Sequence, residues 1–194
     1  MRPLCIQFST CQPETWLGRH IGFPFDPSSS IRRATRSPYS HVDFILFDGC
    51  CLGASDSPDA PVVMGNPRGV AIRPPNYQAF GIRRRAYIDT PRADAIIQRA
   101  TGQLNKPFDH GALKFRHMFS DSFGDRNWRD PGQWYCAELG MWCCEEEHLW
   151  PFELVIQKDR VTAADFLCYL NPIMDVGRFL NPVPGIELCE GETP

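Results

Sequence analysis

Apolar residues alternate with polar ones in short stretches along the first half of the chain. Residues 3–9, PLCIQFS, carry an apolar side chain at every second position, which is the period of a half-buried strand. In the segment SHVDFILFDGCCLGAS, two apolar, β-prone runs flank Asp48-Gly49, a pair suited to a turn with positive φ. This segment predicts a β-hairpin whose first strand begins at His41.

Strand patterns return after a loop. Residues 56–69 are rich in Pro, Asp and Gly and are expected to form that loop. The segments GVAIRPP and FGIRRRAYID, which follow it, offer two more candidate strands. Together these segments predict an antiparallel sheet of about five strands, a size typical of small domains.

From residue 90 onward the apolar residues recur at helical spacing. Thr90-Pro91 is expected to provide the N-cap and the first residue of a helix, and an apolar stripe continues from there to Leu104. Residues 109–119 show a weaker helical pattern. The stretch DSFGDRNWRDPGQW that follows is expected to be a loop because it is rich in Gly, Pro and Asp.

Two more helices are expected toward the end of the chain. Residues 135–147 carry four small or apolar residues on one helix face, namely Cys136, Leu139, Gly140 and Cys143. A helix that begins near Cys136 is expected to bury this face, with the cysteine at its N-terminal end. In the segment RVTAADFLCYL, Thr162 and Asp165 are expected to form a capping pair for the last helix.

These elements predict an α+β domain in which an antiparallel sheet faces helices. A chain of 194 residues and 22.1 kDa suits a single domain over residues 1–194. Its core is expected at roughly 29–170, after an N-terminal strand and loop at 1–28 and before a proline-rich C-terminal tail at 171–194.

Composition excludes several classes of protein. With 43% hydrophobic and 22% charged residues the chain has the make-up of a soluble globular protein, and its apolar runs are too short for a membrane span. A net charge of -3 argues against a nucleic acid partner. The first residues turn polar before a secretory apolar stretch can form, so we expect no signal peptide and synthesis in the cytoplasm. The nine cysteines are then expected to be mostly reduced thiols.

Cys136 and His41 are the candidates for chemistry. A cysteine attacks as its thiolate, which is stabilised at a helix N-terminus and beside an imidazolium. The N–H groups of the first helical turn can also stabilise an oxyanion. A histidine at the start of a sheet strand can face such a helix end and act first as base and then as acid. By placement, Cys136 is the expected nucleophile and His41 the expected base.

Four segments occur along the chain in the order SPYSHVDFILFDG, GNPRGVAIRPP, NKPFDHGALKF and WYCAELGMW. Together they resemble the permuted papain-like amidase family (the YaeF and YiiX type), circularly rearranged relatives of the NlpC-type peptidoglycan peptidases. Versions encoded by phages and prophages look closest.

The resemblance implies a circularly permuted papain-like fold, with Cys136 as nucleophile and His41 as base. The implied reaction is attack on an amide, peptide or related acyl bond through a covalent thioester, with no cofactor. Peptides of peptidoglycan are the first expected substrate. If the chain is phage-encoded, the host cytoplasm or the virion is its expected location.

The third, orienting residue is where the chain departs from the family pattern. Relatives often carry a polar residue twelve positions after the histidine, and that position is Gly53 here, which has no side chain. Asp43 lies two residues from His41 and on the same strand face, so it is the preferred candidate. Ser55 and Asp56 on the returning strand are alternatives, and a site with no third residue is the remaining one.

No metal site is expected, because His110 and His117 have no acid or cysteine at metal-ligand spacing beside them. Lipid acyl transfer and thioester hydrolysis on the same two residues are the enzymatic alternatives to amide cleavage. A noncatalytic binding or structural module, such as a virion component, is the alternative from another class. The glycine at position 53 favours that last reading.

Overall fold

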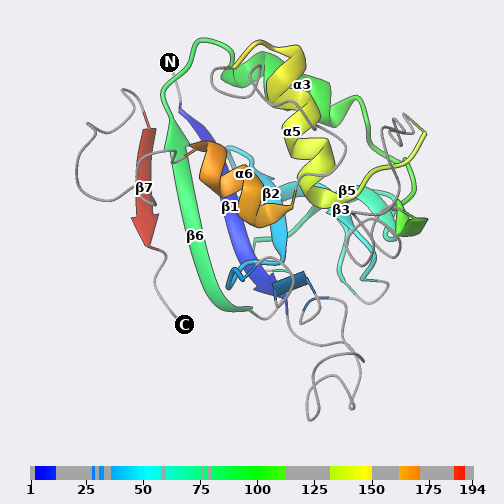
Figure 1. The fold of residues 1–194 in the computed structure, drawn as a ribbon. Coiled ribbons are helices and arrows are strands. Elements are labelled where there is room, and N and C mark those ends of the chain that lie inside the picture. Colours follow the sequence, from blue (N-terminus) through cyan, green and yellow to red (C-terminus); the bar gives the residue numbers. More distant parts are fainter. Residues whose placement is uncertain are drawn as a thin grey trace, which may run out of the picture.

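The computed structural model describes residues 3–11, 28, 31–32, 36–57, 60–75, 77, 80–111, 132–149, 162–170 and 186–190. These residues form an α+β fold with one open antiparallel sheet of seven strands, in the order β4-β5-β3-β2-β1-β6-β7 (Figure 1). The strands are β1 (Leu4–Cys11), β2 (His41–Ile45), β3 (Cys51–Ser55), β4 (Met64–Gly65), β5 (Gly69–Arg73), β6 (Phe80–Ile88) and β7 (Ile186–Glu190). The α+β class and the antiparallel sheet are therefore confirmed.

The five predicted strands form the centre of this sheet, and two edge strands add to them. The first, β4, lies within the loop predicted for residues 56–69 and has only two residues, too few to show an alternating pattern. The second, β7, lies within the predicted tail at 171–194. Its sequence IELCE does alternate, but the proline-rich surroundings hid that signal.

The β2–β3 hairpin forms at the predicted turn. Gly49 has a φ of 84°, which favours glycine, and Leu46 N donates a hydrogen bond to Cys50 O at 2.8 Å. Asp48 Oδ1 accepts a hydrogen bond from Cys50 N at 2.9 Å, and this bond lowers the pKa of the Asp48 carboxyl. The Asp48-Gly49 pair thus closes the hairpin as its residue types predict.

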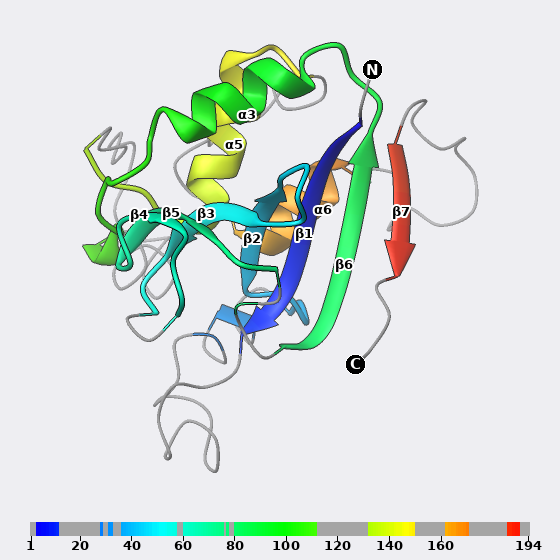
Figure 2. The ribbon, with the colours of Figure 1, turned by 180° about the vertical axis from the view of Figure 1, so that it is seen from behind.

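Three helices have described bounds, which are α3 (Ala93–Thr101), α5 (Cys136–Glu146) and α6 (Ala163–Leu170). Seen from the two sides in Figures 1 and 2, α5 and α6 lie against one face of the sheet. Helix α5 contacts β2, β3, α3 and α6. It is therefore the central element of the helical layer.

The helix starts test the capping predictions. The start of α5 at Cys136 is confirmed. So is the pair at the start of α6, where Asp165 N donates to Thr162 Oγ1 and Thr162 N donates to Asp165 Oδ2. The predicted start of α3 is wrong by two residues. Its N-cap is Arg92, and Thr90 Oγ1 accepts a hydrogen bond from Arg92 N in a turn before the helix.

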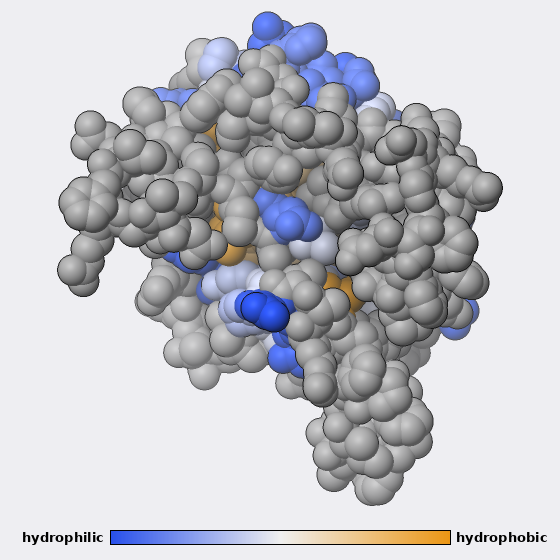
Figure 3. Space-filling model, in the orientation of Figure 1, coloured by the Kyte–Doolittle hydropathy of each residue, from blue (hydrophilic) through white to orange (hydrophobic). Residues whose placement is uncertain are grey.

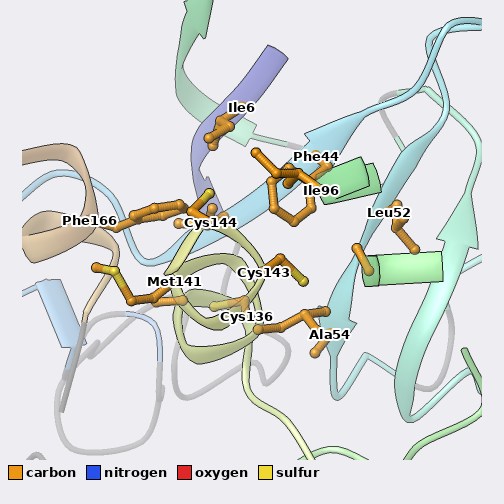
Figure 4. Close-up of a cluster of buried hydrophobic side chains, with 14 of the residues drawn as sticks. Ile6, Phe44, Leu52, Ala54, Ile96, Cys136, Met141, Cys143, Cys144 and Phe166 are labelled. Atoms are coloured by element: carbon orange, nitrogen blue, oxygen red, sulfur yellow. The ribbon is translucent and has the colours of Figure 1, made fainter. Parts of the chain in front are cut away.

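The core lies between the helix-covered sheet face and the helices. Side chains from the strands, such as Ile6, Phe44 and Leu52, share one buried cluster with Cys144 and Phe166 (Figure 4). Helix α5 is buried over a wider surface than its predicted face, since every residue from 136 to 141 is buried. The contacts of α5 with the sheet, α3 and α6 account for this.

Where described residues reach the surface in Figure 3, hydrophilic ones predominate. No helix among the described residues combines the length and the apolar character needed to cross a bilayer. Of the weaker helix predicted for 109–119, only 109–111 are described; residue 109 is not helical, and 110–111 are. The loop predicted after it is described only from residue 132.

Candidate active site

His41 and Asp43 are in contact at the start of β2. Residues two apart on a strand project to the same side, and both of these residues are buried. Asp43 Oδ1 lies 3.0 Å from His41 Nε2, a distance at which a carboxylate accepts a hydrogen bond from an imidazole N–H. Asp43 therefore stands where an orienting acid for His41 would stand.

Tyr77, between β5 and β6 in the chain, joins this pair. Its Oη lies 2.9 Å from His41 Nε2 and donates a hydrogen bond to Asp43 Oδ2 at 3.2 Å. The Tyr77 hydroxyl uses its proton in the bond to the carboxylate, so neither Tyr77 Oη nor Asp43 has a proton to donate to His41 Nε2. Both can bind Nε2 only as acceptors, which requires Nε2 to carry the ring proton. The arrangement thus selects the tautomer protonated on Nε2, in which Nδ1 is the basic nitrogen.

The Asp43 carboxylate lies against Gly53 of β3. A Cβ on Gly53 would overlap Asp43 Oδ1 and would lie 3.2 Å from Asp43 Cγ. Any side chain at position 53 would therefore displace this carboxylate. Because position 53 of β3 is a glycine, it offers no orienting side chain. The same absence of a side chain leaves room for the Asp43 carboxylate of β2.

Arg73, the last residue of β5, lies beside the same group of residues. Its side chain is fully buried, and Nη1 donates a hydrogen bond to Gly53 O at 3.0 Å. The guanidinium also lies 5.3 Å from the ring centroid of Tyr77. Arg73 thus connects the strand under the Asp43 carboxylate to the ring whose hydroxyl binds that carboxylate.

Polar residues of β1 and β6 continue this sheet face. Gln7 pairs with Asp43 on one side and with Arg85 on the other, and its Oε1 accepts a hydrogen bond from Arg85 Nε at 3.1 Å. Burial, and secondly the nearby charge of Arg85, lower the pKa of Arg83. The face next to His41 and Asp43 therefore carries positive charge.

Cys136 is buried and is the first residue of α5. Tyr135 before it is extended, with φ -101° and ψ 166°, and its side chain does not cap the helix. The first N–H groups of a helix have no partner within the helix. Cys136 belongs to the first turn of α5, and N–H groups of a first helical turn are of the kind that an oxyanion site uses.

Backbone contacts hold the entrance of α5 at the end of the sheet where β2 begins. Both β2 and β5 run antiparallel to β3 between them, so the two strands begin at the same end. Gly69, the first residue of β5, forms a bridge with Pro107, and the next residue, Phe108, forms a bridge with Trp134. Trp134 is two residues before Cys136, so the cysteine enters its helix at this end.

His41 and Cys136 nevertheless approach this end from different faces of the sheet. Val42 and Phe44 belong to the core cluster that includes Cys136, and Figure 4 shows Phe44 and Cys136 within it. Because side chains alternate along a strand, His41 and Asp43 point to the opposite face. The β2–β3 ladder extends toward this end only as far as Phe44, so it stops short of His41.

The alternative orienting residues make other contacts. Ser55 Oγ accepts a hydrogen bond from Ser57 N at 3.3 Å. Asp56 Oδ1 lies 3.3 Å from His110 Nε2, so this acid pairs with a different histidine. Asp43, the preferred candidate, contacts His41, with 3.0 Å between Oδ1 and Nε2.

Histidine and cysteine side chains form no metal cluster in the part of the chain that the structure describes. Groups of three or more His, Cys, Asp or Glu side chains suited to a metal ion are absent there. His110 pairs with Asp56, and His117 lies outside the described residues.

Two other thiols of α5 differ from Cys136 in their surroundings. Cys143 and Cys144 are fully buried, and burial raises the pKa of each far above that of an ordinary thiol. Thiols of this kind stay protonated and do not act as nucleophiles. Cys136, with 8% of its surface exposed, lies at the edge of the same core.

Tyr77 and Arg73 were not indicated by the sequence. Nothing in the segment RPPNYQAF marks its tyrosine, because the path of the chain after β5 brings it to His41. For the role of Gly53, the sequence did contain a signal. The Asp48-Gly49 turn fixes the hairpin register, and that register sets position 53 beside Asp43.

Comparison with known proteins assigns no family to this chain. No family model matches it, and neither does any curated protein. Function is therefore inferred from the geometry of the site.

Proposed function

We propose that the protein is a cysteine hydrolase in which the Cys136 thiolate attacks an amide or peptide bond and His41 transfers the protons. The observation that carries the proposal is the contact of His41 with Asp43 and Tyr77, at the sheet end where the helix headed by Cys136 begins. An imidazole held at Nε2 by a carboxylate is oriented for acid–base work through Nδ1.

In the first half of the reaction, Cys136 gives its proton to His41 Nδ1 and its sulfur bonds to the substrate's carbonyl carbon. The N–H groups of the first turn of α5 stabilise the oxyanion that forms. The C–N bond then breaks, and the leaving amine takes the proton from His41. A thioester remains on Cys136, and Asp43 and Tyr77 stabilise the transient imidazolium through Nε2.

In the second half, water attacks the thioester. His41 Nδ1 accepts a proton from the water as the new C–O bond forms, and the C–S bond breaks. The sulfur then regains its proton from His41. The sum is an amide and water giving a carboxylic acid and an amine, and no oxidant, metal or cofactor enters the balance.

The proposal requires Nδ1 of His41 and Sγ of Cys136 to meet at the end of the sheet. His41 is the first residue of β2, and the β2–β3 ladder stops at Phe44. Backbone pairing with β3 therefore does not separate the two side chains at this end. For the pair to form, the imidazole must reach the thiol around the start of the strand.

The resemblance to permuted papain-like amidases supports peptides of peptidoglycan as the first substrate class, and a permuted papain-like topology for the fold. Lipid acyl transfer and thioester hydrolysis use the same thioester chemistry on the same residues, so fold and nucleophile alone do not separate these substrates. The host cytoplasm or a virion is the proposed location if the chain is phage-encoded.

A substrate panel tests the proposal. The purified protein is incubated with peptidoglycan fragments, acyl thioesters and phospholipid vesicles, and products and protein adducts are followed by mass spectrometry. Cleavage is expected together with an acyl adduct on Cys136, and Cys136→Ala and His41→Ala should abolish both. Cys50→Ala and His110→Ala, whose side chains lie outside the site, are the matched controls. Undiminished turnover in Cys136→Ala would contradict the assignment.

A noncatalytic binding module is the second candidate, and the alternation of side chains along β2 favours it. In that case His41, Asp43 and Tyr77 form a buried polar network that specifies the fold, and Cys136 is a core residue. This candidate predicts no adduct with any member of the panel. It also predicts that His41→Ala lowers stability by about 1–3 kcal/mol, because Asp43 would lose a buried partner.

A further inference from the structure

The Asp43 carboxylate is held by groups from three other places in the chain. Gly53 provides the surface against which Oδ1 lies, and the Tyr77 hydroxyl donates to Oδ2 at 3.2 Å. Arg73 fixes both of these groups, since it donates to Gly53 O at 3.0 Å and packs over the Tyr77 ring. Gly53 and Tyr77 thus contact one position, that of a carboxylate 3.0 Å from His41 Nε2, and Arg73 contacts both of them.

This position can be reached from either strand of the hairpin. A Cβ built on Gly53 overlaps Asp43 Oδ1, at a separation similar to that between the Cβ and an Oδ atom of a single aspartate. An aspartate at position 53 would therefore bring an oxygen close to where Asp43 Oδ1 now lies. Without the Asp43 side chain, the nearest neighbour of that Cβ is Val42 O at 3.2 Å, which a small shift accommodates.

Arg73 is an unusual residue for a position with no exposure. Its two terminal nitrogens donate to backbone carbonyls, those of Gly53, Gly69 and Pro67 among them, while its buried Nε has no hydrogen-bond partner among the described residues. Burying a charge with backbone carbonyls as its acceptors costs free energy of folding. The arrangement that carries this cost fixes the β3 backbone and the Tyr77 ring around a carboxylate.

We infer that Gly53, Tyr77 and Arg73 form a carboxylate socket, and that this socket determines where the orienting carboxylate lies, whichever strand supplies it. The inference rests on the proposed role of His41 as the base. Gly53 and Tyr77 are then positioning residues, because Gly53 acts on His41 through Asp43, and Tyr77 acts through Asp43 and through its own contact with Nε2. An acid at position 43 fits because position 53 is a glycine. With the Asp43 side chain removed, an acid at position 53 can supply the carboxylate instead.

An exchange experiment tests the carboxylate socket. Asp43→Ala removes the acid, Gly53→Ala displaces it, and the double variant Asp43→Ala/Gly53→Asp supplies it from β3. The rate of iodoacetamide alkylation of Cys136 at pH 5.5 is measured for each by peptide-resolved mass spectrometry. Gly102→Ala is the matched control, since its Cβ meets no atom closer than Arg99 O at 3.3 Å.

Each single variant should slow alkylation of Cys136 at pH 5.5 by about 10-fold or more, because a misplaced orienting group costs the pair its geometry. The double variant should recover most of this loss, and the control should match the wild type. The socket is refuted if Gly53→Ala behaves like the wild type, or if a folded double variant stays as slow as Asp43→Ala.

A second measurement separates the socket from the catalytic proposal. The ¹⁵N shifts of the His41 ring report which nitrogen carries the proton, independently of Cys136. They should show the Nε2–H tautomer in the wild type and the double variant, and a mixture in Asp43→Ala and Gly53→Ala. If these shifts follow the socket while Cys136 stays inert at pH 5.5, the catalytic proposal fails and the socket stands. If the wild type itself is a mixture, the socket is wrong.

Discussion

At the scale of single residues, the chemistry depends on which ring nitrogen of His41 carries the proton. Asp43 and Tyr77 both lie within hydrogen-bond distance of Nε2, at 3.0 and 2.9 Å. A buried carboxylate and a phenol that donates to it leave one consistent arrangement of protons. In the proposed reaction, that arrangement makes Nδ1 the nitrogen that accepts the thiol proton.

Tyr77→Phe tests this arrangement without removing the acid. The variant keeps the ring over Arg73 but loses the hydroxyl that donates to Asp43 Oδ2. We expect alkylation of Cys136 at pH 5.5 to slow by about 10-fold, the equivalent of one hydrogen bond to a charged group. Thermal unfolding followed by circular dichroism checks that the fold is intact. An unchanged alkylation rate would show that Tyr77 does not position His41.

The buried thiols Cys143 and Cys144 predict how stability depends on alkaline pH. Burial raises the pKa of both in the folded protein above the ordinary value of 9.0. Their contribution to stability is therefore complete below pH 9.0 and is lost as the pH rises further, because only the unfolded chain releases these protons.

Urea unfolding measured from pH 7 to 11 checks this prediction. Above pH 9.0 the free energy of unfolding should fall by up to about 1.4 kcal/mol per pH unit for each buried thiol. The double variant Cys143→Ala/Cys144→Ala should fall less steeply, and Cys50→Ala is the control. Equal slopes in wild type and double variant would contradict the assigned burial of these thiols.

At the scale of elements, the entrance of α5 depends on the start of β5. A Cβ on Gly69 would overlap Lys106 O and lie 2.9 Å from Pro107 Cα. The absence of a side chain at Gly69 therefore allows the bridge to Pro107, and through Phe108 the bridge to Trp134. The position of Cys136 is thus expected to depend on a glycine that is distant from it in sequence.

Gly69→Ala should disturb the site through this path. We expect it to lower stability by about 1–3 kcal/mol, as overpacking against backbone does, and to slow alkylation of Cys136 at pH 5.5. Urea unfolding and peptide-resolved alkylation measure the two effects, with Gly102→Ala again as the control. If the variant is destabilised while Cys136 keeps its wild-type rate, the bridges do not position the cysteine.

The elements that could be predicted are those with a local cause. The hairpin follows from Asp48-Gly49, and α6 follows from the Thr162–Asp165 pair, because each signal acts within a few residues. The start of α3 was misplaced because Thr90 caps a turn there instead of a helix. β7 was missed because its partner β6 is far away in the sequence, and a short edge strand depends on that partner.

In the candidate site, too, the parts that could be predicted are those with a local cause. Asp43 could be placed next to His41 from strand alternation alone, and Cys136 could be placed at the start of α5 from the helical pattern. Tyr77 and Arg73 reach the site through tertiary structure, which no spacing in the sequence encodes. The separation of His41 and Cys136 onto two sheet faces also became visible only with the fold.

At the scale of the whole molecule, the residues proposed to act in the reaction belong to two different faces of the open sheet. Helices α5 and α6 cover one face (Figures 1 and 2), and Cys136 belongs to the core on that side. By strand alternation, His41, Asp43 and the arginines of β6 that pair with their neighbours in β1 belong to the other face. β2, β5 and α5 all begin at one end of the sheet. Function as a hydrolase therefore requires the pair to form at this end.

The pH dependence of Cys136 alkylation tests that requirement most directly. Iodoacetamide rates are measured from pH 4.5 to 9 in wild type, His41→Ala and His110→Ala. Cys50 in the same samples is the reference, because partial burial and the Asp48 carboxylate raise its pKa. A thiolate–imidazolium pair predicts that Cys136 reacts about 100-fold faster than Cys50 at pH 5.5, in wild type and His110→Ala but not in His41→Ala. A wild-type Cys136 that reacts no faster than Cys50 at any pH would contradict the account.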